Sequence, residues 1–307
     1  MNTPLIGLDW GSTRLRAYRF DEVGGVADTR ALPWGSRQLP QGGFEEAFAR
    51  AVEGWPHAPV LACGMVGSRG GWREVPYLDT PCRLEALGRS LTAIDAPDGR
   101  TVHIVPGLRD PAGPDVMRGE ETQVAGVLAR MPGLAGNARL LMPGTHSKWV
   151  RVRDDAVTGF TTLMTGELFA LLRGHSVLGA GLPEGGADDE AFARGVAAAQ
   201  ASGAAGGLSR LFSTRALMLE GALAPASVAD FLSGLLIGDE LRMALAAGWA
   251  TPDAPVLVVG EDALCARYRQ AAPAFGLSLQ STPGATAASG LWRVAAAAGL
   301  LHGLSHA

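Results

Sequence analysis

The sequence has few of the residues that build structural metal sites or disulfide frameworks. Among its 307 residues there are three cysteines and six histidines. Cys63, Cys82 and Cys265 are widely separated and form no C-x-x-C spacing, so we expect neither a zinc site nor a disulfide framework. Free cysteines are typical of the reducing cytoplasm, where we expect the protein to act.

Long apolar runs and a strong charge of either sign are also missing. The longest stretch without a charged residue, 270–292, is interrupted by Pro273, Pro283 and several Gly and Ser residues, which argues against a membrane span. The net charge of −4 provides no electrostatic footprint for nucleic acid or an anionic membrane. The first residues resemble a strand and show no export leader. We therefore expect small-molecule partners, with no nucleic acid and no membrane among them.

Lysine is the scarcest charged residue, because Lys148 is the only one in the chain. It lies in the string PGTHSK, between the apolar runs Leu140–Met142 and Trp149–Val152. This pattern predicts a strand, a hydroxyl-rich turn and a second strand. A lysine retained in an Arg-rich chain, inside such a turn, suggests a compact positive charge placed for phosphate. Chance retention of a single residue is the alternative explanation.

The string LIGLDWGSTRLRAYRF at residues 5–20 has the same organisation, with Asp9 at the end of its first apolar run. A carboxylate at the end of a buried strand is costly unless a cation meets it there. The Gly-Ser-Thr turn that follows offers N–H groups and hydroxyls that suit phosphate oxygens and magnesium-bound water. Walker-type spacing is absent. The pattern predicts a nucleotide site on a hairpin, and an ordinary hairpin with a solvated Asp9 is the alternative.

Strand and helix patterns alternate in both halves of the chain. This alternation predicts an α/β protein with two lobes, which we place at residues 1–133 and 134–307. A chain of this length also suits two domains, and the similar hairpins suggest a duplicated architecture. Further strands are expected at 59–63, 101–106 and 255–260. Helices are expected at 44–55, 120–131, 166–173 and 285–301, with a helix-rich segment at 188–247.

The two hairpins, together with residues 259–276, resemble the two phosphate loops and the adenosine motif of the acetate and sugar kinase, heat-shock ATPase and actin superfamily. Longer strings are more closely similar to the 2-dehydro-3-deoxygalactonokinase family. They are CGMVGSR at 63–69, MRGEETQ at 117–123, PGTHSKW at 143–149 and SGLLIGDEL at 233–241. Cys63 departs from the Ser expected at its position. The resemblance covers essentially the whole chain.

This resemblance implies two ribonuclease H-like lobes, each a mixed five-stranded sheet flanked by helices, with the final helix packing between them. Residues near 9–14 and 144–148 would then converge on one triphosphate in an inter-lobe cleft. The implied cofactors are ATP and Mg²⁺, with Asp9 beside the magnesium through water. The implied nucleotide-binding residues are Gly11, Ser12, Thr13 and Arg14 in the first loop, Gly144, Thr145, Ser147 and Lys148 in the second, and Gly260, Glu261, Leu264 and Tyr268 around adenosine.

Related sugar kinases carry a carboxylate that accepts the proton of the acceptor hydroxyl. In those kinases it follows a glycine just before a helix, and Gly119-Glu120 matches this position. Glu120 is therefore the expected general base, with Glu121 as the alternative. Many relatives have Asp here, so Glu120 would need a longer reach. An acidic pair favoured by the helix dipole in the first turn is the other explanation.

A sugar acid also brings a carboxylate that suits an arginine or a nest of N–H groups. Ser68 and Arg69 follow a predicted strand and are the expected ligands, with Trp72 and Tyr77 as walls of the site. A tryptophan in a loop is more often a packing anchor than a ligand contact, and this is the alternative for Trp72. Two further residues are expected to contact the substrate. They are His146, which could instead contact phosphate, and Glu167, which could instead cap a helix.

The implied activity is ATP-dependent phosphorylation of the terminal (6-) hydroxyl of 2-dehydro-3-deoxy-D-galactonate in galactonate catabolism. The products would be ADP and 2-dehydro-3-deoxy-6-phosphogalactonate, which an aldolase would then cleave. Two alternatives stay open: a kinase for the related 2-dehydro-3-deoxygluconate, and a phosphate-releasing enzyme of the same superfamily. The sequence does not indicate the oligomeric state, although a homodimer is the commonest soluble assembly.

Overall fold

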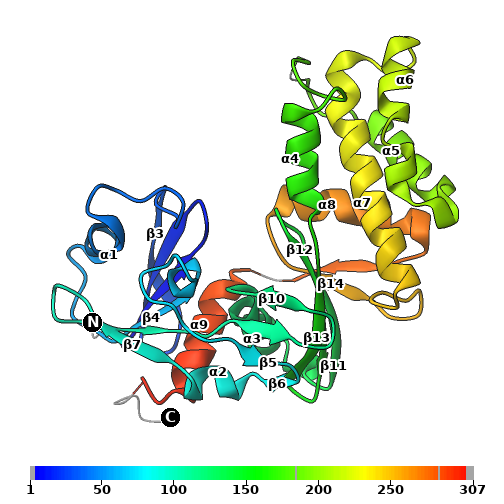
Figure 1. The fold of residues 1–307 in the computed structure, drawn as a ribbon. Coiled ribbons are helices and arrows are strands. Elements are labelled where there is room, and N and C mark those ends of the chain that lie inside the picture. The colour runs from blue at the N-terminus through cyan, green and yellow to red at the C-terminus, as the bar shows by residue number, and fades with distance from the viewer. Residues whose placement is uncertain (1–3, 184, 283, 302–307) are drawn as a thin grey trace. The chain divides into compact units, whose positions relative to one another are not determined.

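The computed structural model describes residues 4–183, 185–282 and 284–301, and its chain divides into two units (Figure 1). Unit 1 contains residues 1–137, 152–159 and 283–307, and unit 2 contains residues 138–151 and 160–282. Each unit is thus assembled from several segments of the chain. The prediction of an α/β fold with sheets flanked by helices is confirmed in both.

Unit 1 is built on a six-stranded sheet of order β3-β2-β1-β4-β8-β7. The first three strands pair antiparallel as a meander, and β4 and β8 continue the sheet in parallel with β1. This is the ribonuclease H-like order, but β7 adds an antiparallel edge strand to the five that we expected. The strands are β1 (Ile6–Trp10), β2 (Leu15–Phe20), β3 (Val26–Leu32), β4 (Val60–Gly64), β7 (Thr92–Asp95) and β8 (Thr101–Ile104).

The two faces of this sheet are covered by different helices, as strand alternation requires. Ile6, Leu8 and Trp10 share one face and pack in a core with helix α1 (Gly43–Val52). Gly7 points the other way, toward Leu291 of helix α9 (Thr286–Ala297). Asp9 follows the same alternation as Gly7 and therefore lies on the α9 side of the strand.

Helices α3 (Glu120–Arg130) and α9 cross with their backbones almost in contact. A Cβ atom on Gly126 would lie 1.8 Å from the carbonyl oxygen of Thr286, and one on Gly290 would lie 1.8 Å from that of Thr122. Only glycine fits at either position. Because α9 also packs on β1, this crossing fixes the start of α3 relative to the central strand.

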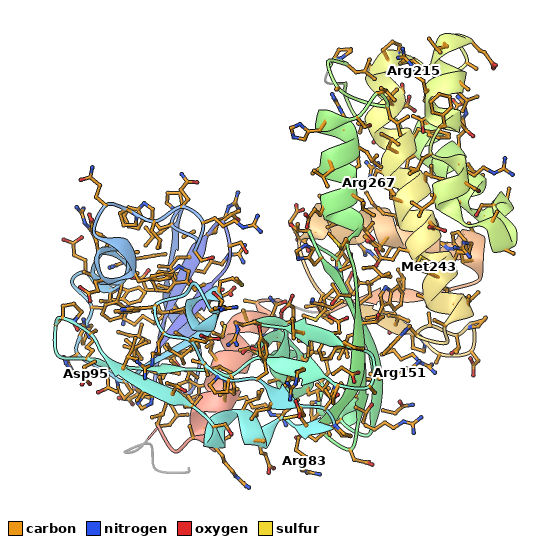
Figure 2. The ribbon with its side chains drawn as sticks, viewed as in Figure 1. Arg83, Asp95, Arg151, Arg215, Met243 and Arg267 are labelled. Atoms are coloured by element: carbon orange, nitrogen blue, oxygen red, sulfur yellow. The ribbon has the colours of Figure 1, made fainter. Side chains whose placement is uncertain are left out.

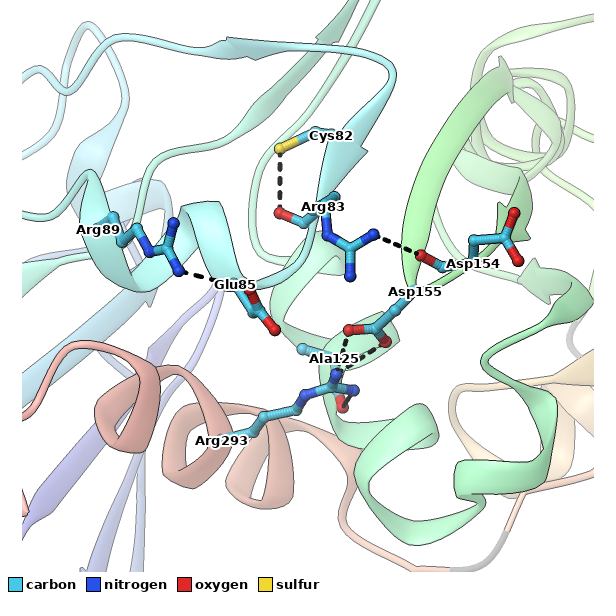
Figure 3. A network of polar contacts seen from close by, with 8 residues as sticks. All are labelled: Cys82, Arg83, Glu85, Arg89, Ala125, Asp154, Asp155 and Arg293. Carbon is cyan, nitrogen blue, oxygen red and sulfur yellow. Dashed lines mark hydrogen bonds and ion pairs between the residues drawn. The ribbon is translucent and has the colours of Figure 1, made fainter.

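Unit 1 also holds the turn between two long strands, β12 (Ser147–Arg153) and β13 (Ala156–Leu163). The turn residues Asp154 and Asp155 both have positive φ, at 48° and 60°. Figure 3 shows Arg293 of α9 donating to both oxygens of the Asp155 carboxylate, at 2.7 and 2.6 Å. The Leu84 N–H donates to the Asp155 carbonyl at 3.1 Å. The Asp155 N–H donates to the Ala135 carbonyl at 2.8 Å, so contacts from three parts of the chain hold the turn.

Unit 2 carries most of a second six-stranded sheet, of order β15-β14-β11-β12-β13-β6. Read from the opposite edge, its strands β13-β12-β11-β14-β15 follow the same chain order as β3-β2-β1-β4-β8 of unit 1, which confirms the predicted duplication. Strand β6 is again one strand more than expected. Helices α5 (Asp189–Ala201) and α7 (Val228–Ala246) cross like α3 and α9, since a Cβ on Gly195 would lie 2.1 Å from the Phe231 carbonyl oxygen. The strands not yet given are β6 (Cys82–Arg83), β11 (Asn137–Met142), β14 (Val256–Val258) and β15 (Leu279–Ser281).

The helix-rich segment predicted at 188–247 is confirmed as α5, α6 and α7. The helices of unit 2 are α4 (Thr165–His175), α5 (Asp189–Ala201), α6 (Ser213–Leu219), α7 (Val228–Ala246) and α8 (Asp262–Ala271). Unit 1 has in addition helix α2 (Glu85–Arg89) and a small sheet of β5 (Leu78–Asp79), β9 (Leu108–Asp110) and β10 (Asp115–Met117). None of the helices among the described residues combines the length and apolar character needed to cross a bilayer.

We predict that Gly126→Ala lowers the free energy of unfolding by ~1–3 kcal/mol, because the new methyl group must displace backbone at the α3–α9 crossing. The control is Gly174→Ala in α4, where a Cβ would meet nothing within 4 Å. The free energy of unfolding of that variant should rise by up to ~1 kcal/mol, because alanine has a higher helix propensity than glycine. Thermal unfolding followed by circular dichroism measures both. Equal effects of the two substitutions would contradict the steric explanation.

Candidate active site

Asp9 lies at the end of β1 between two neighbouring strands. Its register partners are Arg16 on β2 and Cys63 on β4. The Arg16 guanidinium is 3.7 Å from one carboxylate oxygen, and the Cys63 thiol is 4.0 Å from the other. Burial raises the pKa of Asp9 above its ordinary value, and Arg16 offsets part of this rise. The ionised form of a buried carboxylate that has only one distant cationic partner is stabilised when a further cation binds nearby.

The turn after β1 is supported from behind by residues 35–37. The N–H groups of Ser36 and Arg37 donate to the carbonyls of Gly11 and Ser12, both at 3.0 Å. A Cβ on Gly35 would lie 2.2 Å from the backbone nitrogen of Thr13, so this support also needs glycine. Within the described chain, no hydrogen bond uses the N–H groups of Ser12 and Thr13. Thr13 and Arg14 are exposed, so the turn presents free donors to a ligand.

Helix α3 begins close to the ends of β1 and β4. Its N-cap Gly119 has a φ of 107°, and a Cβ there would be 3.3 Å from the Cα of Gly64, the last residue of β4. Two carboxylates follow in the first turn. Glu120 is half-buried and accepts the Arg118 N–H at 2.9 Å. Together with Asp9 and Cys63, Glu120 and Glu121 form the cluster of ionisable groups in this part of unit 1.

Glu121 differs sharply from its neighbour. It is 0% exposed, and its carboxylate accepts the Gly119 N–H at 2.7 Å and the Thr122 hydroxyl at 2.9 Å. Burial, and secondarily the Glu120 carboxylate, raises the pKa of Glu121 to about 7. Fully enclosed and already hydrogen-bonded, Glu121 positions the start of α3, whereas Glu120 retains a surface through which a substrate can be reached.

The segment expected to bind the sugar acid folds back on itself. The Ser68 hydroxyl donates to the Met65 carbonyl at 2.8 Å and closes a short turn, while Arg69 is exposed. Trp72 packs on the unit 1 core, with its ring 5.5 Å from Phe48. Its contacts are therefore those of a packing anchor. Tyr77 is 37% exposed and remains accessible.

Arg118 was not singled out from the sequence, although it lies in the MRGEETQ string. Its guanidinium stacks 4.3 Å from the centre of the Tyr77 ring, and Nη2 donates to the Val75 carbonyl at 2.7 Å. Nε and Nη1 are buried without a hydrogen-bond partner among the described residues. Arg118 thus links the loop at 65–75 to the start of α3.

In unit 2, the turn between β11 and β12 contains the second set of predicted phosphate ligands. Gly144 and Thr145 lie against the start of α4, because a Cβ on Gly166 would be 2.4 Å from the Gly144 carbonyl oxygen. The Glu167 N–H donates to the Thr145 carbonyl at 3.0 Å. His146 Nε2 lies 2.5 Å from Glu167 Oε2, and both side chains are exposed. The structure therefore pairs two residues that were predicted separately.

Ser147 and Tyr268 are placed inside unit 2 by a buried carboxylate that sequence reasoning missed. Glu240 of α7 accepts Trp149 Nε1–H at 2.9 Å, the Tyr268 hydroxyl at 2.6 Å and the Thr165 hydroxyl. Ser147 Oγ lies 3.1 Å from the Tyr268 hydroxyl and is 0% exposed. Burial raises the pKa of Glu240. Its sequence signal is a Glu within the apolar helix pattern SGLLIGDEL.

Lys148 lies on the opposite side of β12 from Ser147, as alternation along a strand requires. Its ammonium donates to the Thr162 hydroxyl on β13 at 2.6 Å, and its side chain is largely buried. Of the residues predicted around adenosine, Gly260 and Glu261 are exposed at the start of α8.

A pocket of about 260 Å³ opens beside the turn between β11 and β12, entirely within unit 2. Its walls come from this turn, α4, α7 and α8, and they are mainly apolar, as is typical of small-molecule sites. The predicted residues Gly144, Leu264 and Tyr268 line it. The lining residues that were not predicted are Thr165, Gly166, Phe169, Ala229, Asp230, Ser233, Leu236, Ile237 and Arg267.

Comparisons with known proteins agree with one another. A family model described as 2-keto-3-deoxy-galactonokinase matches residues 9–294. A protein of Rhizobium meliloti (strain 1021), named probable 2-dehydro-3-deoxygalactonokinase DgoK1, is 39% identical over 89% of this chain and 90% of its own. The 2-dehydro-3-deoxygalactonokinase of Escherichia coli (strain K12) is 36% identical over 94% of this chain and 95% of its own. A crystal structure from Sinorhizobium meliloti, described as a 2-dehydro-3-deoxygalactonokinase protein, matches with a TM-score of 0.84 at 38% identity, covering 95% of this chain and 98% of that one.

The buried Glu121 predicts a pH-dependent stability. Below its ordinary pKa of 4.5, both folded and unfolded chains hold the proton, but between 4.5 and about 7 only the folded chain keeps it. The stabilisation is therefore present at low pH and lost as the pH rises through about 7. From about pH 5 to about pH 8, the wild type should lose up to ~3 kcal/mol more unfolding free energy than Glu121→Gln. Chemical denaturation of both proteins at the two pH values measures this difference. An equal change in unfolding free energy for the wild type and for Glu121→Gln would contradict the prediction.

The Glu240 network predicts a second stability effect. Glu240→Gln places an amide NH₂ among hydrogen-bond donors and should lower the free energy of unfolding by ~1–3 kcal/mol. Tyr268→Phe removes only one donor and is the matched control, with an expected cost near ~1 kcal/mol. Urea denaturation measures both variants. If Glu240→Gln proves no more destabilising than the control, the network does not hold these elements together.

Proposed function

Because the chain belongs to the 2-keto-3-deoxy-galactonokinase family, we propose that it phosphorylates the terminal 6-hydroxyl of 2-dehydro-3-deoxy-D-galactonate with ATP. The products are ADP and 2-dehydro-3-deoxy-6-phosphogalactonate. The observation that carries this proposal is the family match along nearly the whole chain, at 36–39% identity to two kinases of that name. The chain would serve galactonate catabolism in the cytoplasm, a compartment that suits its free cysteines.

The residues of unit 1 fit the phosphate end of a nucleotide. The turn at 11–14 offers N–H groups that no other part of the described chain uses, and Asp9 lies at its base. A single carboxylate suits Mg²⁺, which keeps most of its water and takes further oxygen ligands from phosphates. ATP supplies the phosphoryl group, and Mg²⁺ would neutralise its charge. Gly11, Ser12, Thr13 and Arg14 would orient the phosphates, which is the main catalytic need in phosphoryl transfer.

The residues of unit 2 fit the rest of the nucleotide. Gly144, which lines the 260 Å³ pocket, and its neighbour Thr145 would contact phosphate, and Leu264 would pack on the base inside the pocket. Glu261 and Gly260 would border the ribose at the start of α8. Ser147 and Tyr268 would act through Glu240, by holding the loop and α8 in place. We propose that Lys148 supports the phosphates bound by the turn at 143–146.

Glu120 is proposed as the general base that removes the proton from the 6-hydroxyl. It is half-buried at the start of α3, whereas Glu121 is enclosed and hydrogen-bonded. Ser68, Arg69 and Tyr77 would contact the sugar acid in the first lobe (1–133), with Trp72 supporting their loop. His146 and its partner Glu167 are proposed to contact the substrate.

A coupled assay of ADP release tests the proposed reaction. We expect turnover with 2-dehydro-3-deoxygalactonate, weaker turnover with 2-dehydro-3-deoxygluconate, and almost none without a sugar acid. Phosphate release that is independent of a sugar acid would instead assign the chain to the phosphate-releasing enzymes of the superfamily. A clear preference for the gluco epimer would correct the substrate.

For the general base, Glu120→Gln should lower kcat by ~10²–10⁴ and leave ATP binding nearly unchanged. The control is Glu85→Gln, which alters an exposed carboxylate paired with Arg89 on helix α2. Steady-state kinetics and calorimetric titration with an ATP analogue provide the two readouts. Near-normal turnover of Glu120→Gln would remove Glu120 from this role.

A further inference from the structure

The N–H groups that the turn at 11–14 presents are directed by the carbonyl groups of the same turn. In a planar trans peptide, a carbonyl and the N–H that follows it point in opposite directions. The Gly11 carbonyl therefore sets the direction of the Ser12 N–H, and the Ser12 carbonyl sets that of the Thr13 N–H. Both carbonyls accept hydrogen bonds from the N–H groups of Ser36 and Arg37, at 3.0 Å each. The N–H groups of Ser12 and Thr13 thus point away from this supporting segment.

The supporting segment, residues 34–37, is itself fixed by a hydrogen bond from the end of β1. Trp10 Nε1–H donates to the Trp34 carbonyl at 3.0 Å. The Trp10 side chain is 0% exposed and belongs to the core between α1 and the unit 1 sheet, where Figure 2 shows side chains filling the space. Its ring centre lies 5.1 Å from that of Phe44 and 6.3 Å from that of Trp72. Packing therefore holds the indole donor in one place.

The supporting segment transmits this restraint to the turn. Gly35 follows Trp34 and lies directly against the turn, since a Cβ there would be 2.3 Å from the Ser12 carbonyl carbon. The Gln38 N–H donates to the Gly35 carbonyl at 2.9 Å and closes the segment into a turn of its own. A segment this short and this tightly folded has little freedom once the Trp34 carbonyl is held.

We propose that Trp10 is a positioning residue for phosphoryl transfer. Its indole N–H holds the supporting segment, and this segment aims the N–H groups of Ser12 and Thr13 at the terminal phosphates of the nucleotide. Trp10 is enclosed in the core and acts through these residues, without contact to a substrate. The inference rests on the proposed function in one respect, namely that the turn at 11–14 binds those phosphates.

Trp10→Phe tests this inference, because it keeps an aromatic side chain in the core and removes the N–H donor. The matched control is Trp55→Phe. Trp55 belongs to the same core, and its Nε1–H donates to Asp28 Oδ2 at 3.0 Å. Asp28 pairs with Arg19, near the end of β2 that is remote from the turn. Both substitutions remove an indole hydrogen bond and should lower the urea midpoint of unfolding to a similar extent.

Two functional readouts separate positioning from a purely structural role. In the coupled assay, kcat of Trp10→Phe should fall by ~10–100-fold, because misplaced phosphates are poorly oriented for transfer, while KM for the sugar acid should change less than ~3-fold. In calorimetric titration without sugar acid, the variant should bind a non-hydrolysable ATP analogue ~10-fold more weakly than the wild type does. Binding of AMP, which lacks the terminal phosphates, should be unchanged. Trp55→Phe should match the wild type in every one of these measurements.

A wild-type kcat in Trp10→Phe would overturn the inference, and so would an equal kinetic defect in Trp55→Phe. If Trp10→Phe does not fold, Gly35→Ala replaces it, since the added Cβ must displace the supporting segment from the turn. Wild-type binding of the ATP analogue by Gly35→Ala would then overturn the inference. If the wild type phosphorylates no sugar acid, only the proposed reaction fails, and the comparison of the ATP analogue with AMP still decides the role of Trp10.

Discussion

Close approach of backbone to backbone is the constraint on which the rest of this structure depends. At the α3–α9 and α5–α7 crossings, a single added Cβ would lie about 2 Å from a carbonyl oxygen of the partner helix. The same contact recurs beside both phosphate loops, where Gly35 meets Thr13 and Gly166 meets Gly144. With no side chains between them, these segments have little freedom to shift, so the turns that would hold phosphate are set by packing.

Each unit also contains one buried glutamate that holds several elements in place. Glu121 ties the first turn of α3 to Gly119, and Glu240 gathers donors from β12, α4 and α8. A buried carboxylate is costly unless donors surround it, so each must keep its partners in place to remain stable. Glu121 and Glu240 thus hold the groups around them in place, while the exposed residues nearby remain available to bind ligands.

The sequence predicted much of the fold because long periodic segments are the easiest to recognise. The hairpin at 5–20, the helix at 120–131 and the helix-rich segment at 188–247 are all confirmed. Strand β3 was missed because its residues are mostly exposed and give no clear apolar alternation. The added edge strands β6 and β7 were missed as well, since two to four residues give no periodic signal. For the site, the sequence could indicate Asp9, Glu120 and the two loops, but it missed Arg118, Glu240 and the polar residues Asp230, Ser233 and Arg267 that line the pocket of unit 2.

What the sequence determined by itself is the local chemistry: which strands end in a carboxylate or a hydroxyl-rich turn, and which family shares those strings. Only the tertiary structure decided which side chains face outward. Ser147 and Trp72 read as ligand contacts in a linear string, yet the first is enclosed beside Tyr268 and the second packs on the unit 1 core. Asp230, Ser233 and Arg267 read as ordinary helix residues, yet they meet at one wall. Burial and hydrogen bonding depend on residues that are distant in the chain, and no local pattern records those partners.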